Sequence, residues 1–104
     1  MSITVRGGGM IVKDPDSSEP LTFNWDEEHL PVGVTIVASS FLILGTDAVL
    51  TKDNEGILPG ARTTQVRIIA GTLGVKYTLT NRVTTNQVPA AIKDQSIRVL
   101  IQHR

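Results

Sequence analysis

The sequence predicts an all-β protein, an immunoglobulin-like antiparallel β-sandwich of about seven strands. First, 40% of the 104 residues are apolar but the aromatics are only one Trp, one Tyr and two Phe, so the core must be aliphatic. Val, Ile and Thr are common, and these β-branched residues favour strands over helices. Second, several segments alternate apolar and polar residues with the period of a half-buried strand. Third, turn signals recur too often for a crossover helix to fit between strands.

The chain begins with residues 1–9, which we expect to form a flexible arm ahead of a sandwich made by residues 10–104. Residues 2–6 can form a short strand, but glycines occupy positions 7–9 and give the backbone wide freedom there. Ile3 and Val5 alternate with polar neighbours. Such an extended segment is suited to adding a strand to the sheet edge of a neighbouring subunit. Ile3 and Val5 are therefore candidate interface residues.

The sandwich strands are bounded by turn residues. Lys-Asp-Pro-Asp at 13–16 and Asp-Asn-Glu-Gly at 53–56 predict turns, and residues 26–30 are expected to form a single helical turn. In an immunoglobulin-like topology, the long strand at 34–44 should share a sheet with the last two strands. The expected strands, in order, are 10–13, 21–25, 34–44, 48–52, 64–70, 75–84 and 95–102.

The segment GTLGVKYTLTNRVTT, residues 71–85, predicts a corner followed by a two-faced strand. Gly71 and Gly74 allow positive φ where the chain passes from one sheet to the other. Tyr77 then begins the penultimate strand, where an immunoglobulin-like sandwich often places a tyrosine whose hydroxyl bonds back to the corner backbone. These three residues are the predicted structural corner. The alternative is that Tyr77 is packed for its bulk alone.

A candidate interface follows from two strands whose alternation fails. Both faces of the strand 34–44 are largely apolar, and Leu100 interrupts the polar face of the terminal strand. If Ile36 points inward, an apolar patch on the outer face is expected, rimmed by the cations Lys76 and Arg82. In the alternative, Val88 and Ile92 form a lid over the strand. The residues assigned to the predicted interface on this face are Val37, Phe41, Ile43, Arg82 and Leu100.

The sequence offers little catalytic or ligand-binding chemistry. Ten basic and ten acidic residues give zero net charge without a basic cluster, so no nucleic-acid partner is expected. The chain has no cysteine and only two histidines, and its acidic loops match no calcium-binding signature. The longest apolar stretch, 32–44, is too short and polar to cross a membrane, and the first residues lack the apolar core of a secretory signal. We therefore expect a soluble protein made in a cytoplasm, not an enzyme, with no cofactor or metal and no membrane contact.

Four stretches taken together resemble a known family. They are VKDPD (12–16), LTFNWDEEHLPVGVTIVASSF (21–41), TTQVRIIAGTLGVKYTLTNRVTT (63–85) and QSIRVLIQHR (95–104). Their order and spacing are similar to those of small tailed-bacteriophage virion proteins with an immunoglobulin-like fold, often described as fibre–tail adaptors. The arm 1–9 and the apolar loop 86–94 depart from the family pattern.

The resemblance implies a non-enzymatic structural subunit that joins virion components by protein–protein contacts. Its implied partners are other phage structural proteins of the tail, fibre or capsid and copies of itself, and its implied location is the virion, assembled in the host cytoplasm. One alternative is a capsid decoration protein on the phage head. Another is a carbohydrate or host-surface binding module, although such modules normally expose several aromatic residues on one face.

Overall fold

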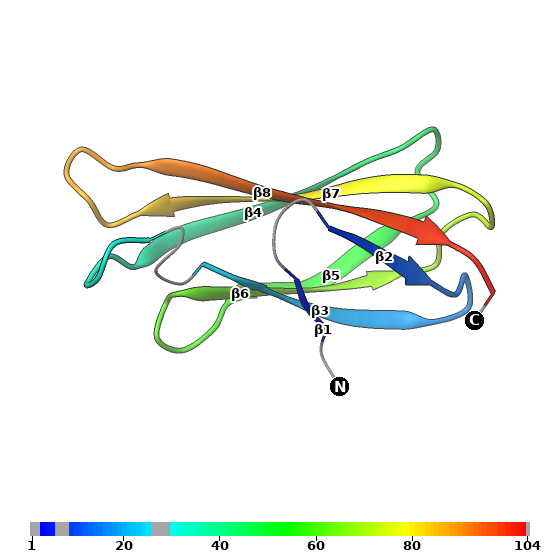
Figure 1. Cartoon of the computed structure of the whole chain (residues 1–104), viewed down its shortest axis with the longest axis horizontal. Helices are drawn as coiled ribbons and strands as arrows, with labels where there is room; N and C mark the ends of the chain where they lie inside the picture. Colours follow the sequence, from blue (N-terminus) through cyan, green and yellow to red (C-terminus); the bar gives the residue numbers. More distant parts are fainter. Residues whose placement is uncertain (1–2, 6–8, 26–29, 104) are drawn as a thin grey trace.

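The protein is a sandwich of two four-stranded β-sheets, and the computed structural model describes residues 3–5, 9–25 and 30–103 (Figure 1). The first sheet has the strand order β1-β3-β6-β5 and the second the order β2-β8-β7-β4. The all-β sandwich predicted from the sequence is confirmed. The strands are β1 (Ile3–Val5), β2 (Met10–Lys13), β3 (Ser18–Asn24), β4 (Ile36–Leu44), β5 (Thr51–Ile57), β6 (Thr63–Ile69), β7 (Lys76–Thr85) and β8 (Ile92–Ile101).

The second sheet is built around β7, which pairs antiparallel with both β4 and β8. The expectation that the long strand near residues 34–44 shares a sheet with the last two strands is therefore confirmed. Both sheets also contain a parallel pair, because β1 runs parallel to β3 and β2 runs parallel to β8. The N-terminal segment thus contributes one edge strand to each sheet, and residues 3–5 of the expected arm lie on the edge of the first sheet.

The strand β5 differs from the prediction. A turn was expected at residues 53–56, and this expectation is wrong. The chain continues through this segment as a strand paired with β6, and the register shifts between Asp53 and Gly56. Asn54 adopts a φ of 53° there, a conformation that Asn tolerates better than most residues. An edge strand can absorb extra residues as a bulge without reversing direction. The reversal comes later, at Gly60 and Ala61, where φ is 93° and 54°. Most of the helical turn expected at 26–30 lies outside the described residues.

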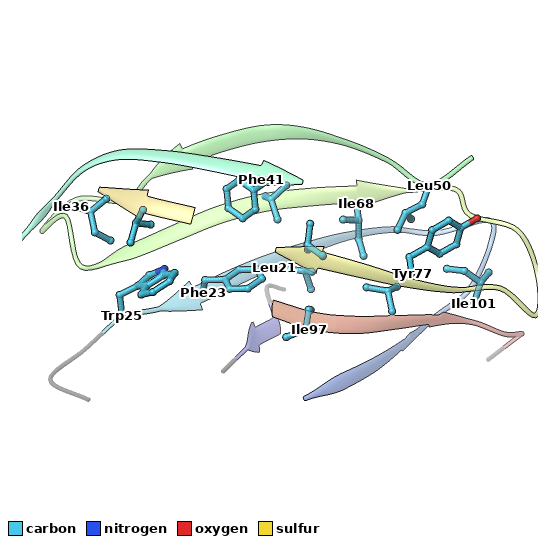
Figure 2. Packing of buried hydrophobic residues seen from close by; sticks show 14 of the residues in the cluster. Leu21, Phe23, Trp25, Ile36, Phe41, Leu50, Ile68, Tyr77, Ile97 and Ile101 are labelled. Atoms are coloured by element: carbon cyan, nitrogen blue, oxygen red, sulfur yellow. The ribbon is translucent and has the colours of Figure 1, made fainter. Parts of the chain in front are cut away.

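The core lies between the two sheets and is mainly aliphatic, as expected from the composition (Figure 2). The strand β7, and β8 from Gln95 onward, follow strict alternation, with inward positions buried and outward positions at least partly exposed. Trp25 lies near one end of the cluster and Tyr77 near the other. Between these ends the ring of Phe41 packs edge-on against that of Phe23, with centroids 5.7 Å apart. All four aromatic side chains of the protein are buried.

Candidate interaction surface

A β-bulge near the start of β4 decides which residues of this strand face outward. The register against β7 shifts between Ile36, which pairs with Thr85, and Ala38, which pairs with Thr84. The extra residue reverses the alternation, so that Ile36 and Phe41 both point into the core although they differ by an odd number of positions. The predicted patch assumed that the side chains of this strand point to the two faces in turn without interruption, and this assumption is wrong.

The bulge changes the predicted apolar patch. Phe41 is only 7% exposed and Ile43 packs against the core, so their assignment to the outer surface is wrong. Val37 is exposed, as expected. The reason for its exposure is that it lies at the bulge. The outward positions of β4 are taken instead by Leu42 and Leu44, each 55% exposed.

The other predicted interface residues lie apart from one another. Leu100 is half-buried on the outer face, in register with Val12 of β2 and Lys76 of β7. Arg82 is exposed and forms an ion pair with Asp94, with an N–O distance of 2.9 Å. Because Lys76 and Arg82 are separated along β7 by about 20 Å of strand, Leu100 and Arg82 do not form one patch.

The remaining expectations for the interface concern the loop and the arm. Val88 is 99% exposed and Ile92 is 65% exposed, so the alternative in which they form a lid is wrong. The backbones of Ile3 and Val5 pair with those of Leu21 and Phe23 of β3. Their side chains are outside the part of the chain that the structure describes.

The outer face of the second sheet is rich in hydroxyl groups. Thr78, Thr80 and Thr84 point outward from β7, and the hydroxyls of Thr80 and Ser96 are 2.8 Å apart. Two shallow hollows of about 180 and 140 Å³ lie on this face. The first is lined by Ser40, Leu42, Thr80 and Arg82, and the second by Gly9, Thr78, Ser96, Ile97 and Arg98.

The charges on this face are mostly positive. Lys76 and Arg98 lie on the neighbouring strands β7 and β8. They are two register positions apart, because Lys76 pairs with Leu100 and Arg98 pairs with Thr78. Both cations are exposed. Arg82 is paired with Asp94, whose pKa is lowered mainly by the hydrogen bond from the Arg82 guanidinium. The outer face therefore combines hydroxyls, two exposed leucines and an excess of positive charge.

The corner between β6 and β7 is fixed by the hydroxyl of Tyr77. Gly71 and Gly74 have φ values of 108° and 82°. The Tyr77 hydroxyl accepts a hydrogen bond from the backbone N–H of Thr72 at 3.0 Å and donates one to Asp47 Oδ1 at 2.5 Å. The hydrogen bond from Tyr77, followed by those from the Val49 N–H and the Thr72 hydroxyl, holds the pKa of Asp47 below its usual range. The hydroxyl thus joins the corner to the loop that follows β4.

Gly45 contributes to the same corner and was missed by the sequence reasoning. A Cβ atom at this position would lie 2.4 Å from the ring of Tyr77, which is closer than real side chains approach. The chain can therefore pass over the Tyr77 ring at the end of β4 only with glycine. In the sequence Gly45 only follows the expected strand 34–44, because a ring from a distant segment leaves no local signal.

A buried hydrogen-bond network joins the two sheets at Asn81. Its side-chain oxygen accepts from Trp25 Nε1 at 3.0 Å and from Thr64 Oγ1 at 2.6 Å. Its amide nitrogen donates to Ser39 Oγ and to the Ser40 carbonyl, both at 2.9 Å. Asn81 is fully buried. A polar residue at an inward position of β7 was the signal that could have identified it from the sequence.

Lys13 is a second buried polar residue. Its Nζ donates to the carbonyl oxygens of Ala70 and Asp14, which connects the end of β2 to the corner before β7. Burial lowers the pKa of Lys13, and the nearby carboxylates of Glu19 and Asp14 oppose this shift. These contacts account for Lys13 as a structural residue.

Among the described residues, no group of three or more His, Asp or Glu side chains is arranged to hold a metal ion. A hollow of about 350 Å³ on the outer face of the first sheet is lined by Pro20, Leu21, Asn54, Glu55, Gln65, Val66 and Arg67. The Arg67 guanidinium there is already paired with Asp53. Within residues 3–5, 9–25 and 30–103 there is also no helix of a length and hydropathy suited to crossing a bilayer.

Comparison with solved structures supports the fold. The cysteine protease inhibitor EhICP2 from Entamoeba histolytica superposes with a TM-score of 0.58 at 7% sequence identity, covering 96% of this chain and 92% of that one. Amebosin aligns over 98% of this chain and 99% of its own at 10% identity, with a TM-score of 0.41. The first likeness shows a shared fold alone, and the second is too distant to carry an argument. No curated protein matches the sequence.

A family model gives the more specific result. The family described as "Podophage GP4 fiber-tail adaptor protein gp77" matches residues 13–100. The match runs from the last residue of β2 into β8, so it includes most of both sheets and the corner at Tyr77. The resemblance stated from the sequence is therefore confirmed. The chain belongs to the family of the podophage GP4 fiber-tail adaptor protein gp77 and is a structural protein of a phage virion.

Proposed function

We propose that the protein is a non-enzymatic adaptor subunit that joins phage fibre and tail components by protein–protein contacts. The observation that carries the proposal is the family match over residues 13–100. The outer face of the second sheet is the contact surface that fits best, because its exposed leucines are surrounded by hydroxyls and cations. This combination of apolar groups and a polar border is typical of protein interfaces.

Burial of the aromatic residues argues against the carbohydrate-binding alternative. Sugar-binding modules use exposed aromatic rings as stacking platforms. Phe23 and Trp25 are 0% exposed, Tyr77 is 1% exposed and Phe41 is 7% exposed, and the chain has no other aromatic residue. No ring is therefore available on the surface to stack against a sugar.

The position of the subunit distinguishes an adaptor from a capsid decoration protein. Phage particles carrying a labelled copy should show the label at the tail, in a ring of low copy number. A lattice of label over the head, with hundreds of copies per particle, would contradict the adaptor proposal and support decoration.

The contact surface can be tested with two matched variants. Thr78→Arg places a large cation in the middle of the proposed face, beside Arg98, and Gln65→Arg places the same group at an exposed outward position of β6 in the other sheet. Particles assembled without the native subunit should incorporate the Gln65→Arg protein but not the Thr78→Arg protein, although both fold. Equal incorporation would exclude this face as the contact surface.

We also propose that residues 1–9 act in assembly more than in folding. The described residues of this segment are the three of β1, which pair with the edge of β3, and Gly9, whose carbonyl accepts a hydrogen bond from the Arg98 N–H. A protein lacking residues 1–9 should retain its circular dichroism spectrum and cooperative unfolding but enter particles poorly. Loss of cooperative unfolding would show that β1 is required by the core.

A further inference from the structure

The four edge strands of the sandwich differ in how they are protected against pairing with another chain. The edges of the first sheet are β1, with three residues, and β5, which contains a bulge and the charged residues Lys52, Asp53 and Glu55. The second sheet ends in β2, with four residues, and in β4. Short length, bulges and charges are the usual means by which proteins prevent edge-to-edge association.

The β4 edge lacks these protections over most of its length. The strand has nine residues, IVASSFLIL, with no charged residue and no proline. Its bulge lies at the start, so Ala38–Leu44 is a regular segment of seven residues. Among the strands that the structure describes, this segment pairs on one side only, with β7. The backbone N–H and C=O groups on the free side of this segment can form hydrogen bonds with an extended strand of another molecule.

We propose that the β4 edge pairs antiparallel with the β4 edge of a second copy of this protein. A two-fold axis at Phe41, the midpoint of Ala38–Leu44, places Leu44 opposite Ala38 of the second copy and Leu42 opposite its Ser40. Each large outward side chain then meets a small one. The two sheets become one continuous eight-stranded sheet, in which the β4 strands lie at the centre.

Charged side chains on the outer face do not prevent this self-association. On the outer face, the nearest charged side chain in register with β4 is Arg82, which lies one strand away beside Ser40 and is paired with Asp94. In the proposed dimer the Arg82 strands of the two copies are three strand spacings apart, about 14 Å. This distance exceeds the screening length of about 8–10 Å at physiological salt, so like charges do not oppose the contact.

The size of the contact predicts a weak dimer. Seven paired residues span about 23 Å, and the sandwich edge is about 10 Å deep, which gives about 500 Å² for the two copies together. This area is below the roughly 1,000 Å² of a stable interface. Self-association should therefore require high micromolar to millimolar protein in solution. In a virion, the other contacts of each subunit would supply the local concentration that stabilises it.

The test measures the oligomeric state of the purified full-length protein, so it does not depend on the proposed function in the virion. Sedimentation velocity at increasing concentration should show a monomer–dimer equilibrium. Leu42→Lys should weaken it at least tenfold, because the two lysines would lie close together across the axis. Ile92→Lys is the matched control, since Ile92 is an exposed apolar residue on β8, two strands from the edge, and it should dimerise like the native protein.

Three results would overturn the proposal. The native protein could remain monomeric up to millimolar concentration, or Leu42→Lys could dimerise as strongly as Ile92→Lys. The third result is loss of the dimer when residues 1–9 are deleted, which would indicate that a neighbour's N-terminal strand, and not its β4, occupies the edge.

Discussion

Replacing Asn81 with leucine removes the polar group that connects the two sheets while keeping a side chain of similar size. The Asn81 amide exchanges four hydrogen bonds with Trp25, Thr64, Ser39 and Ser40. The partners on β4 lie at a sheet edge, where water can replace the lost bonds. The partners on the other side, Trp25 and Thr64, are fully buried, so the cost should come mainly from them.

The magnitude follows from those two donors. Each buried donor left without a partner costs about 1–3 kcal/mol. The Trp25 N–H retains a longer contact of 3.4 Å to Thr64 Oγ1, which reduces the loss. We therefore expect Asn81→Leu to lower the free energy of unfolding by about 2–4 kcal/mol. For a domain of this size, such a change lowers the midpoint of thermal unfolding by about 10–20 °C.

The test compares urea denaturation of four proteins, which are the native protein, Asn81→Leu, Trp25→Phe and the double variant. Trp25→Phe removes the indole N–H, so the double variant Asn81→Leu with Trp25→Phe no longer contains the donor of Trp25, although that of Thr64 remains. The double variant should be more stable than the sum of the single changes predicts, by about 1–2 kcal/mol. Additive effects, or a change below about 0.5 kcal/mol for Asn81→Leu alone, would refute the assignment of Asn81 as a necessary inter-sheet bridge.

Three further predictions concern the corner and the bulged strand. Tyr77→Phe should cost about 1–3 kcal/mol of unfolding free energy because the Thr72 amide loses its acceptor, and Tyr77→Ala about 3–5 kcal/mol because it also leaves a cavity; an unchanged urea midpoint for Tyr77→Phe would mean that the hydroxyl is not needed. Phe41→Asp should abolish folding, measured by circular dichroism, because it buries a charge at a core position, whereas a folded but assembly-deficient protein would return Phe41 to the surface. The pKa of Asp47 is lowered in the folded protein from its usual value of 3.8, so its stabilising contribution is present above that value and lost as pH falls through the lower folded value; the stability difference between the native protein and Asp47→Asn should shrink below about pH 4, and a difference independent of pH would contradict this.

The sequence by itself determined the sandwich and most of its strands. Alternation along β7 and β8 is a local property, because successive side chains of an extended backbone point to opposite faces. The buried positions Tyr77 and Leu79 on β7, and Ile97 on β8, could therefore be read without knowing their partners. The order of turn, strand and corner segments along the chain likewise sufficed to indicate the virion-protein family, although no single residue carries a recognisable chemistry.

Only the tertiary structure decided which face β4 presents and how the sheets are joined. The parity of Phe41 depends on a bulge that exists only in the pairing of β4 with β7, so both registers were compatible with the apolar residues of the strand. The network at Asn81 depends on Trp25 and Thr64, which lie 56 and 17 residues away in the chain. Strand pairing and buried polar contacts are made between distant segments, and a sequence pattern records the direction of a side chain but not its partner.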